Sequence, residues 1–126
     1  MLFRSPVISH LNIYSGEPEL DGVWRLYYGC ANAPNYFGWT VNASDPDTTD
    51  LVTMYYRWTD GSILHHEMTR EDSYGELWDD SLTVQENWAI GPLSVWFQGT
   101  DALGNLGPKF DPATEGYRFE VGECQL

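Results

Sequence analysis

Carboxylate and amide side chains are concentrated in two short segments that lie far apart in the sequence. The first segment contains Asp45, Asp47 and Asp50, and the second contains Asp101 and Asn105. Oxygen atoms of this kind bind Ca²⁺, which takes roughly six to eight oxygen ligands. Such side chains also cap turns by bonding their own backbone, and Asn105 after Gly104 is typical of a turn. The choice between calcium binding and turn formation depends on whether the fold brings the segments together.

A further group of acidic residues could serve an enzyme only if its carboxylates faced one another across a groove. The group comprises Glu67, Glu71, Asp72, Glu76, Asp79 and Asp80. Glycoside hydrolysis requires two carboxylates that flank the scissile bond, and these residues follow no such catalytic template. His65 and His66 are adjacent, so on a strand they point to opposite faces and cannot share one metal ion in the usual way. We therefore predict a non-catalytic protein without a cofactor, and calcium is the candidate ion.

The two cysteines, Cys30 and Cys124, either pair or are inert. They form no CxxC motif and have no neighbouring histidine, so nothing supports zinc binding or thioredoxin-type chemistry. We predict a disulfide, which would close most of the chain and is of use only in an oxidising compartment. The corresponding location is extracellular or at the cell surface. Export is an inference from the disulfide, because the first residues do not have the features of a signal peptide.

The composition favours one folded domain, residues 1–126, with an acidic surface. The formal net charge is −13, and aromatic residues make up 15% of the chain. The enrichment in Tyr, Trp, Val and Thr favours strands. So negative a chain is a poor partner for nucleic acid or anionic lipid, because both require Lys and Arg to displace counterions. No apolar run is long enough to insert into a membrane. Either solubility or cation binding explains the acidity.

Apolar and polar residues alternate along the chain, and no window has the period of a long amphipathic helix. This pattern predicts an all-β fold with strands at 6–14, 23–28, 37–43, 51–58, 63–68, 77–83, 93–100 and 117–121. Asp60-Gly61 predicts a hairpin turn between two of these strands. Residues 1–22 are predicted to form an N-terminal strand and a connection. Residues 109–116 contain Pro112, which predicts a loop or bulge before the last strand.

The alternation also assigns each side chain of the central strands to a face of its sheet. The core is predicted to contain Val52, Met54, Tyr56, Trp58, Leu93, Val95, Phe97 and Gly99, with residues 37–43 supplying the facing sheet. The outer face then gathers Tyr55, Arg57, His65, Trp96 and Gln98. Aromatic side chains clustered on an exposed face often mark a binding site for a sugar or a protein. The alternative is cross-strand pairing that only stabilises the sheet.

Three segments resemble bacterial immunoglobulin-like domains and the related fibronectin type III-like sandwiches of secreted and surface proteins. They are Trp39-Thr-Val-Asn-Ala-Ser-Asp-Pro-Asp47, Val52-Thr-Met-Tyr-Tyr-Arg-Trp58 with Asp60-Gly61, and Leu93 to Asn105, which ends in a TDxxGN turn. The chain departs from the family pattern at Gly99, where a small apolar residue is usual, and at Asp80, which would face inward with Trp78 and Leu82. The resemblance implies an immunoglobulin-like two-sheet antiparallel β-sandwich of about seven to eight strands.

In an immunoglobulin-type sandwich, the loops that follow strands 37–43 and 93–100 lie at the same end. Asp45, Asp47 and Asp50 are therefore expected near Asp101 and Asn105, where calcium would bind. The resemblance implies a structural, spacer or adhesive module within a longer protein, with neighbouring domains as partners. One alternative is a module that binds polysaccharide or protein through the aromatic face. Another is a decoration domain of a virion or appendage.

Overall fold

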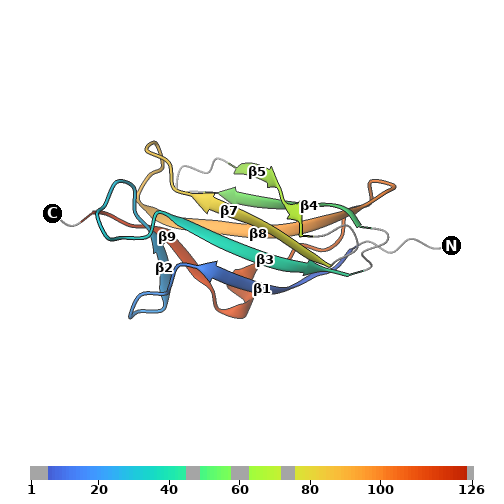
Figure 1. Cartoon of the computed structure of the whole chain (residues 1–126), viewed down its shortest axis with the longest axis horizontal. Coiled ribbons are helices and arrows are strands. Elements are labelled where there is room, and N and C mark those ends of the chain that lie inside the picture. Colours follow the sequence, from blue (N-terminus) through green and yellow to red (C-terminus); the bar gives the residue numbers. More distant parts are fainter. Residues whose placement is uncertain (1–5, 45–48, 58–62, 72–75, 125–126) are drawn as a thin grey trace.

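The computed structural model describes residues 6–44, 49–57, 63–71 and 76–124, which fold into two packed β-sheets (Figure 1). One sheet has the order β1 (Ile8–Ser15), β3 (Tyr36–Ala43), β7 (Leu77–Thr83) and β6 (Thr69–Arg70). The other has the order β2 (Val23–Leu26), β9 (Arg118–Val121), β8 (Gly91–Asp101), β4 (Thr49–Arg57) and β5 (Ile63–Glu67). A 3₁₀ helix, η1 (Pro112–Glu115), precedes β9.

The predicted all-β sandwich is confirmed, and every predicted strand is present. The alternating pattern missed β6, whose two residues are too few to show a period. The sheets are mostly antiparallel and contain one parallel pair. β2 pairs with β9 in parallel, with Val23 opposite Arg118 and Leu26 opposite Val121. The connection after β1 carries the chain to the edge of the second sheet, where β2 runs in the same direction as β9 (Figure 1).

The strand order corresponds to that of an immunoglobulin sandwich. The sheet β1-β3-β7-β6 has the order of immunoglobulin strands A, B, E and D, and β9-β8-β4 has the order of G, F and C. β5 then extends the second sheet beyond β4, as the additional strand C′ does in variable-type domains. The β4–β5 pair is antiparallel, as the hairpin prediction requires. Asp60 and Gly61, the predicted turn, lie outside the described residues.

The core lies between the two sheets and follows the predicted alternation. Phe37, Trp39, Val41 and Ala43 of β3 are fully buried, and they face a buried row from β4 and β8. That row contains Val52, Met54, Leu93, Val95 and Phe97. Gly99 is buried as well. A Cβ atom at Gly99 would lie 2.9 Å from Cβ of Pro6, so glycine is needed for the N-terminal residues to pack there.

Trp39 lies at the centre of this core and contacts both sheets. Its ring makes edge-on contacts with Phe97 and Phe119, at centroid distances of 5.6 and 5.7 Å. Its indole N–H donates a hydrogen bond to Sδ of Met54, 3.1 Å away on β4. In antibody domains a disulfide joins the strands equivalent to β3 and β8. Here the contact between Trp39 and Phe97 spans the same pair of strands.

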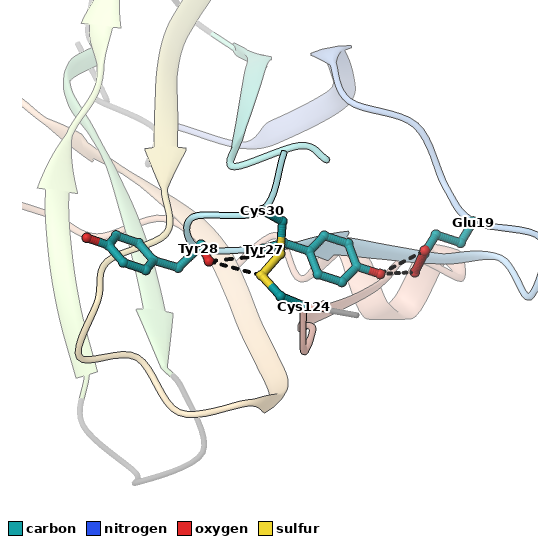
Figure 2. Close-up of a disulfide and its surroundings, with 5 residues drawn as sticks. All are labelled: Glu19, Tyr27, Tyr28, Cys30 and Cys124. Atoms are coloured by element: carbon teal, nitrogen blue, oxygen red, sulfur yellow. Dashed lines mark hydrogen bonds between the residues drawn. A yellow bond between two sulfur atoms is a disulfide. The ribbon is translucent and has the colours of Figure 1, made fainter. Parts of the chain in front are cut away.

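The disulfide occurs elsewhere, between Cys30 and Cys124, whose Cα atoms are 5.6 Å apart. It links the connection after β2 to the segment that follows β9 (Figure 2). The carbonyl oxygen of Tyr28 lies against the bridge, 3.2 Å from Sγ of Cys124. The ring of Tyr27 packs so closely on Gly122 that a Cβ atom there would collide with it. The predicted disulfide is therefore present and holds the two chain segments together.

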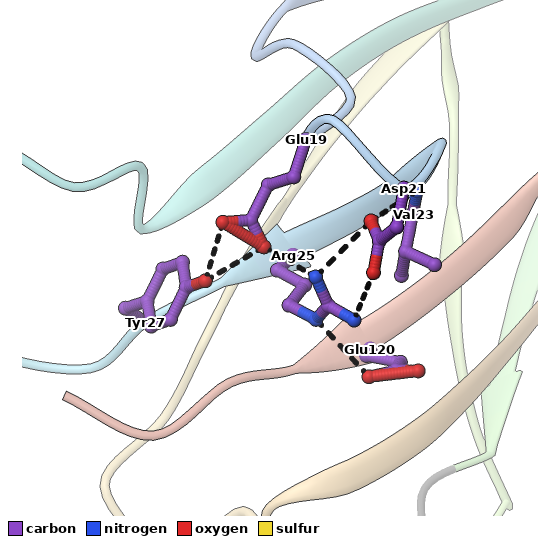
Figure 3. Close-up of polar contacts among 6 residues, drawn as sticks. All are labelled: Glu19, Asp21, Val23, Arg25, Tyr27 and Glu120. Atoms are coloured by element: carbon purple, nitrogen blue, oxygen red, sulfur yellow. Dashed lines mark hydrogen bonds and ion pairs between the residues drawn. The ribbon is translucent and has the colours of Figure 1, made fainter. Parts of the chain in front are cut away.

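Arg25 on β2 ties the same end of the molecule together electrostatically (Figure 3). Its guanidinium contacts Glu19 at 2.6 Å, Asp21 at 2.7 Å and Glu120 of β9 at 3.1 Å. The hydroxyl of Tyr27 also donates to Glu19. The hydrogen bond from Arg25, and then the one from Tyr27, hold the pKa of Glu19 below its usual value. The network fastens the connection before β2 onto the β2–β9 pair.

We predict that Met54→Leu destabilises the fold by about 1–3 kcal/mol, because it leaves the buried indole N–H of Trp39 without an acceptor. The change itself nearly conserves volume. Urea denaturation of the two proteins measures the difference in unfolding free energy. Met68→Leu is the matched control, since Met68 is also buried and its sulfur accepts no hydrogen bond among those seen in the described residues. Equal losses in both variants would contradict the assigned role of the Trp39–Met54 bond.

Candidate functional site

The outer face of the five-stranded sheet carries all five residues of the predicted binding face. Tyr55 on β4 lies opposite His65 on β5 and Trp96 on β8. Arg57 lies opposite Ser94, and Gln98 lies opposite Thr53. The Gln98 amide donates a hydrogen bond to the carbonyl of Gly107 at 2.7 Å, so this side chain is held against the neighbouring segment. The face is thus assembled by three adjacent strands, β5, β4 and β8.

Trp96 is packed on both sides along this face. The rings of Tyr55 and Trp96 are parallel within 5°, with centroids 5.6 Å apart. The ammonium of Lys109 lies 5.1 Å from the centroid of Trp96. β4 pairs with β8 along one edge. The segment that contains Lys109 lies along the other edge, where Phe110 forms an isolated β-bridge with Phe97. A neighbour therefore occupies each side of the Trp96 ring, and cross-strand and cation–π contacts of this kind generally stabilise a sheet.

Lys109 is the functional candidate that the sequence analysis missed. It lies in a segment predicted as a loop or bulge, so no strand period could assign it to a face. In the structure this segment contains η1, which Asp111 caps by accepting a hydrogen bond from the N–H of Ala113, and Phe110, which pairs with Phe97. The feature of the sequence that could have drawn attention to this residue is that Lys109 is the single lysine of the chain.

A groove of about 240 Å³ adjoins Trp96. Its lining consists of Arg57, Ile63, Ser94, Trp96, Lys109 and Asp111. A second groove of about 220 Å³ shares Ser94 and Asp111 with the first and reaches Tyr117 and Arg118. The two grooves thus meet over Ser94, on the outer side of β8.

Asp80 forms a different polar site, at the edge between the sheets. It lies opposite Trp39 in the β3–β7 pairing, so it faces inward in line with Trp78 and Leu82. Its carboxylate accepts hydrogen bonds from the backbone N–H of Ser81, at 2.7 Å, and from Nδ1 of His66, at 2.5 Å. His66 is exposed, like every residue of the edge strand β5.

This edge also opens into a groove of about 390 Å³ that His66 shares with Tyr56 and Trp88. The rings of Tyr56 and Trp88 lie 5.5 Å apart. Burial raises the pKa of Tyr56, and the negative charge of Asp80 raises it further. The phenol is therefore held in its neutral form beside the carboxylate.

The turn after β8 is organised around Asp101, which is 1% exposed. Oδ1 accepts hydrogen bonds from the N–H groups of Leu103 and Asn105, both at 2.9 Å. Oδ2 accepts from the side-chain amide of Asn105 at 3.1 Å. Burial opposes ionisation of Asp101, but the bonds from Asn105, Leu103 and Gly104 outweigh it and hold its pKa below the usual value. Both oxygens thus take part in turn formation.

The calcium site stays a prediction. Asp45 and Asp47 lie outside the described residues, and the structure does not describe the side chain of Asp50. Thr49 pairs with Asp101, which places the start of β4 beside the turn. Within the described ranges, no three His, Cys, Asp or Glu side chains converge in a way that could hold a metal ion.

Comparison with known proteins finds no family model and no curated protein that matches the chain. In the described part of the chain, no helix has the length and apolar character needed to cross a bilayer.

We predict that Asp101→Asn lowers the melting temperature at pH 7 by several degrees. Both carboxylate oxygens of Asp101 accept hydrogen bonds from N–H groups, whereas an asparagine side chain has only one oxygen that can accept. The lowered pKa means that ionised Asp101 stabilises the fold above about pH 4 and that this contribution is lost as the pH falls through the folded pKa. The difference in melting temperature between the two proteins should therefore shrink as the pH is lowered from 7 to 3. Asp111→Asn, at the exposed cap of η1, serves as the control, and a pH-independent gap would refute the role given to the Asp101 charge.

Proposed function

We propose that the chain is a non-catalytic, immunoglobulin-like module of a modular secreted or cell-surface bacterial protein, in which it acts as a spacer or adhesive element. The observation that carries the proposal is the immunoglobulin strand order combined with a disulfide. Disulfides persist in oxidising environments, which favours an extracellular location. Fold alone does not determine function. The positions of the two chain ends provide further support for the spacer role.

The first and last strands place the two ends of the described chain at opposite ends of the sandwich (Figure 1). Ile8, at the start of β1, pairs with Ala43 at the end of β3, close to the turn after β8. Val121, at the end of β9, pairs with Gly91 at the beginning of β8. A module with this geometry can be joined in series with neighbours and contributes its full length to the chain.

The disulfide provides the first test of this proposal. Cys30 and Cys124 are separated by 94 residues, so a reduced chain is expected to lose about 4–5 kcal/mol of unfolding free energy in the entropic model. Urea denaturation with and without reductant measures this loss in the wild type. A double variant, Cys30→Ser with Cys124→Ser, should have the same unfolding free energy as the reduced wild type. Its unfolding free energy should not change when reductant is added. Two reactive thiols in unreduced protein secreted through an oxidising compartment would overturn the extracellular assignment.

A second test addresses the spacer role and the absence of catalysis. Two copies joined in tandem should scatter X-rays as an elongated particle, with each copy unfolding as it does alone. A compact particle with the copies side by side would contradict the spacer role. Release of sugar from a polysaccharide panel by the purified protein would contradict the non-catalytic role.

The outer face of the five-stranded sheet supports a second candidate function, the binding of a carbohydrate or protein. The supporting observation is that Tyr55, Arg57, His65 and Trp96 share one face that includes a groove. Trp96→Ala should then abolish signal on a glycan or protein array while the protein stays folded. An array signal that survives this substitution would exclude the Trp96 face as the binding surface.

A further inference from the structure

The positively charged residues of this acidic chain are unevenly placed. The chain has six Lys and Arg residues against nineteen Asp and Glu residues. Arg25 is engaged by three carboxylates, and Arg70 lies over the ring of Trp78. The cations Arg57, Lys109 and Arg118 instead line the two grooves that meet over Ser94 on the outer face of the five-stranded sheet.

The register explains how these cations surround one point. Arg57 lies directly opposite Ser94 in the β4–β8 pairing. Leu93 pairs with Phe119 on the other side of β8, which brings the neighbouring Arg118 beside Ser94. Lys109 reaches the same groove over the ring of Trp96. Because serine is small, the surface between the three cations is hollow rather than filled by a side chain.

None of the three cations is neutralised by a carboxylate within the described part of the chain. The ion pairs seen there involve Arg25 and His66, not these residues. The two acidic residues that line the grooves already have donors. Asp111 accepts from the N–H of Ala113, and Glu120 accepts from Arg25. Positive charge is thus left available at this face despite the net charge of the chain.

We propose that the groove over Ser94 binds a carboxylate-bearing sugar residue of a glycan, an inference that rests on the carbohydrate-binding role of this face. Arg57 and Arg118 flank the carboxylate, and the Ser94 hydroxyl donates to it, since charge-assisted hydrogen bonds are the strong ones. Both sides of the Trp96 ring are occupied, so Trp96 and Tyr55 present their edges to the sugar and charge provides the selectivity. The negative charge of the whole chain repels long polyanions, which favours short acidic oligosaccharides.

The test is calorimetric titration of the folded protein with trigalacturonate and with its carboxyl-reduced, neutral counterpart. The acidic trisaccharide is expected to bind at least about tenfold more tightly than the neutral one. Arg57→Gln and Arg118→Gln should each weaken its binding by about fivefold to tenfold, and Lys109→Gln should do the same. Lys109→Arg keeps the positive charge and should retain binding. All these residues are exposed, and melting curves check that each variant is folded.

Asn12→Asp is the matched control for net charge, because it also makes the chain more negative by one unit. Asn12 is exposed on β1, in the other sheet, so this variant should bind like the wild type. Equal binding of both trisaccharides, sensitive to Trp96→Ala but not to Arg57→Gln, would overturn the carboxylate assignment and leave the binding role of the face intact. Selective binding that survives all three glutamine substitutions would place the site elsewhere. Absence of binding by either trisaccharide at millimolar concentration would refute the carboxylate proposal, while the array experiment with Trp96→Ala would still decide the binding role independently.

Discussion

Trp39 and its hydrogen bond to Met54 are the interaction on which the remaining structure depends. A buried indole requires a partner for its N–H, and in this core the partner is a sulfur atom on the opposite sheet. The edge-on contacts with Phe97 and Phe119 add two more strands of that sheet to the same ring. A shift of β4 or β8 by one residue would turn their inward side chains to solvent. The core contact therefore also fixes which residues, among them Tyr55 and Trp96, face outward.

The two ends of the sandwich are closed by different kinds of interaction. At the end where β8 begins, the disulfide and the Arg25 network hold β2 and β9 together. At the end where β8 finishes, close packing and turn hydrogen bonds dominate. Pro6 lies against Gly99 and so close to Gly107 that a Cβ atom at Gly107 would strike its carbonyl oxygen. The glycine at position 99 thus has a steric cause.

The sequence predicted strands well because each strand buries one face, and burial of one face produces an alternating pattern that is local in the chain. Apart from the two-residue strand β6, the features that it missed are non-local. β2 runs parallel to β9 because of how the chain crosses between sheets, and Arg25 meets Glu120 across 95 positions. The same reason applies to Asp80, because its hydrogen-bond partner is His66 on the edge strand β5, 14 positions away in the sequence. Periodicity assigns a residue to a face but does not identify its neighbours.

The same distinction applies to the outer face of the five-stranded sheet. Alternation alone could place Tyr55, Arg57 and Trp96 on one side of their strands. It could not reveal that Lys109 occupies one side of the Trp96 ring and Tyr55 the other. With both sides occupied, the ring is less suited to stack on a sugar than an open tryptophan would be. In the proposed binding role, recognition at this face depends on the charges around Ser94, and those charges are distinctive because the rest of the chain is so acidic.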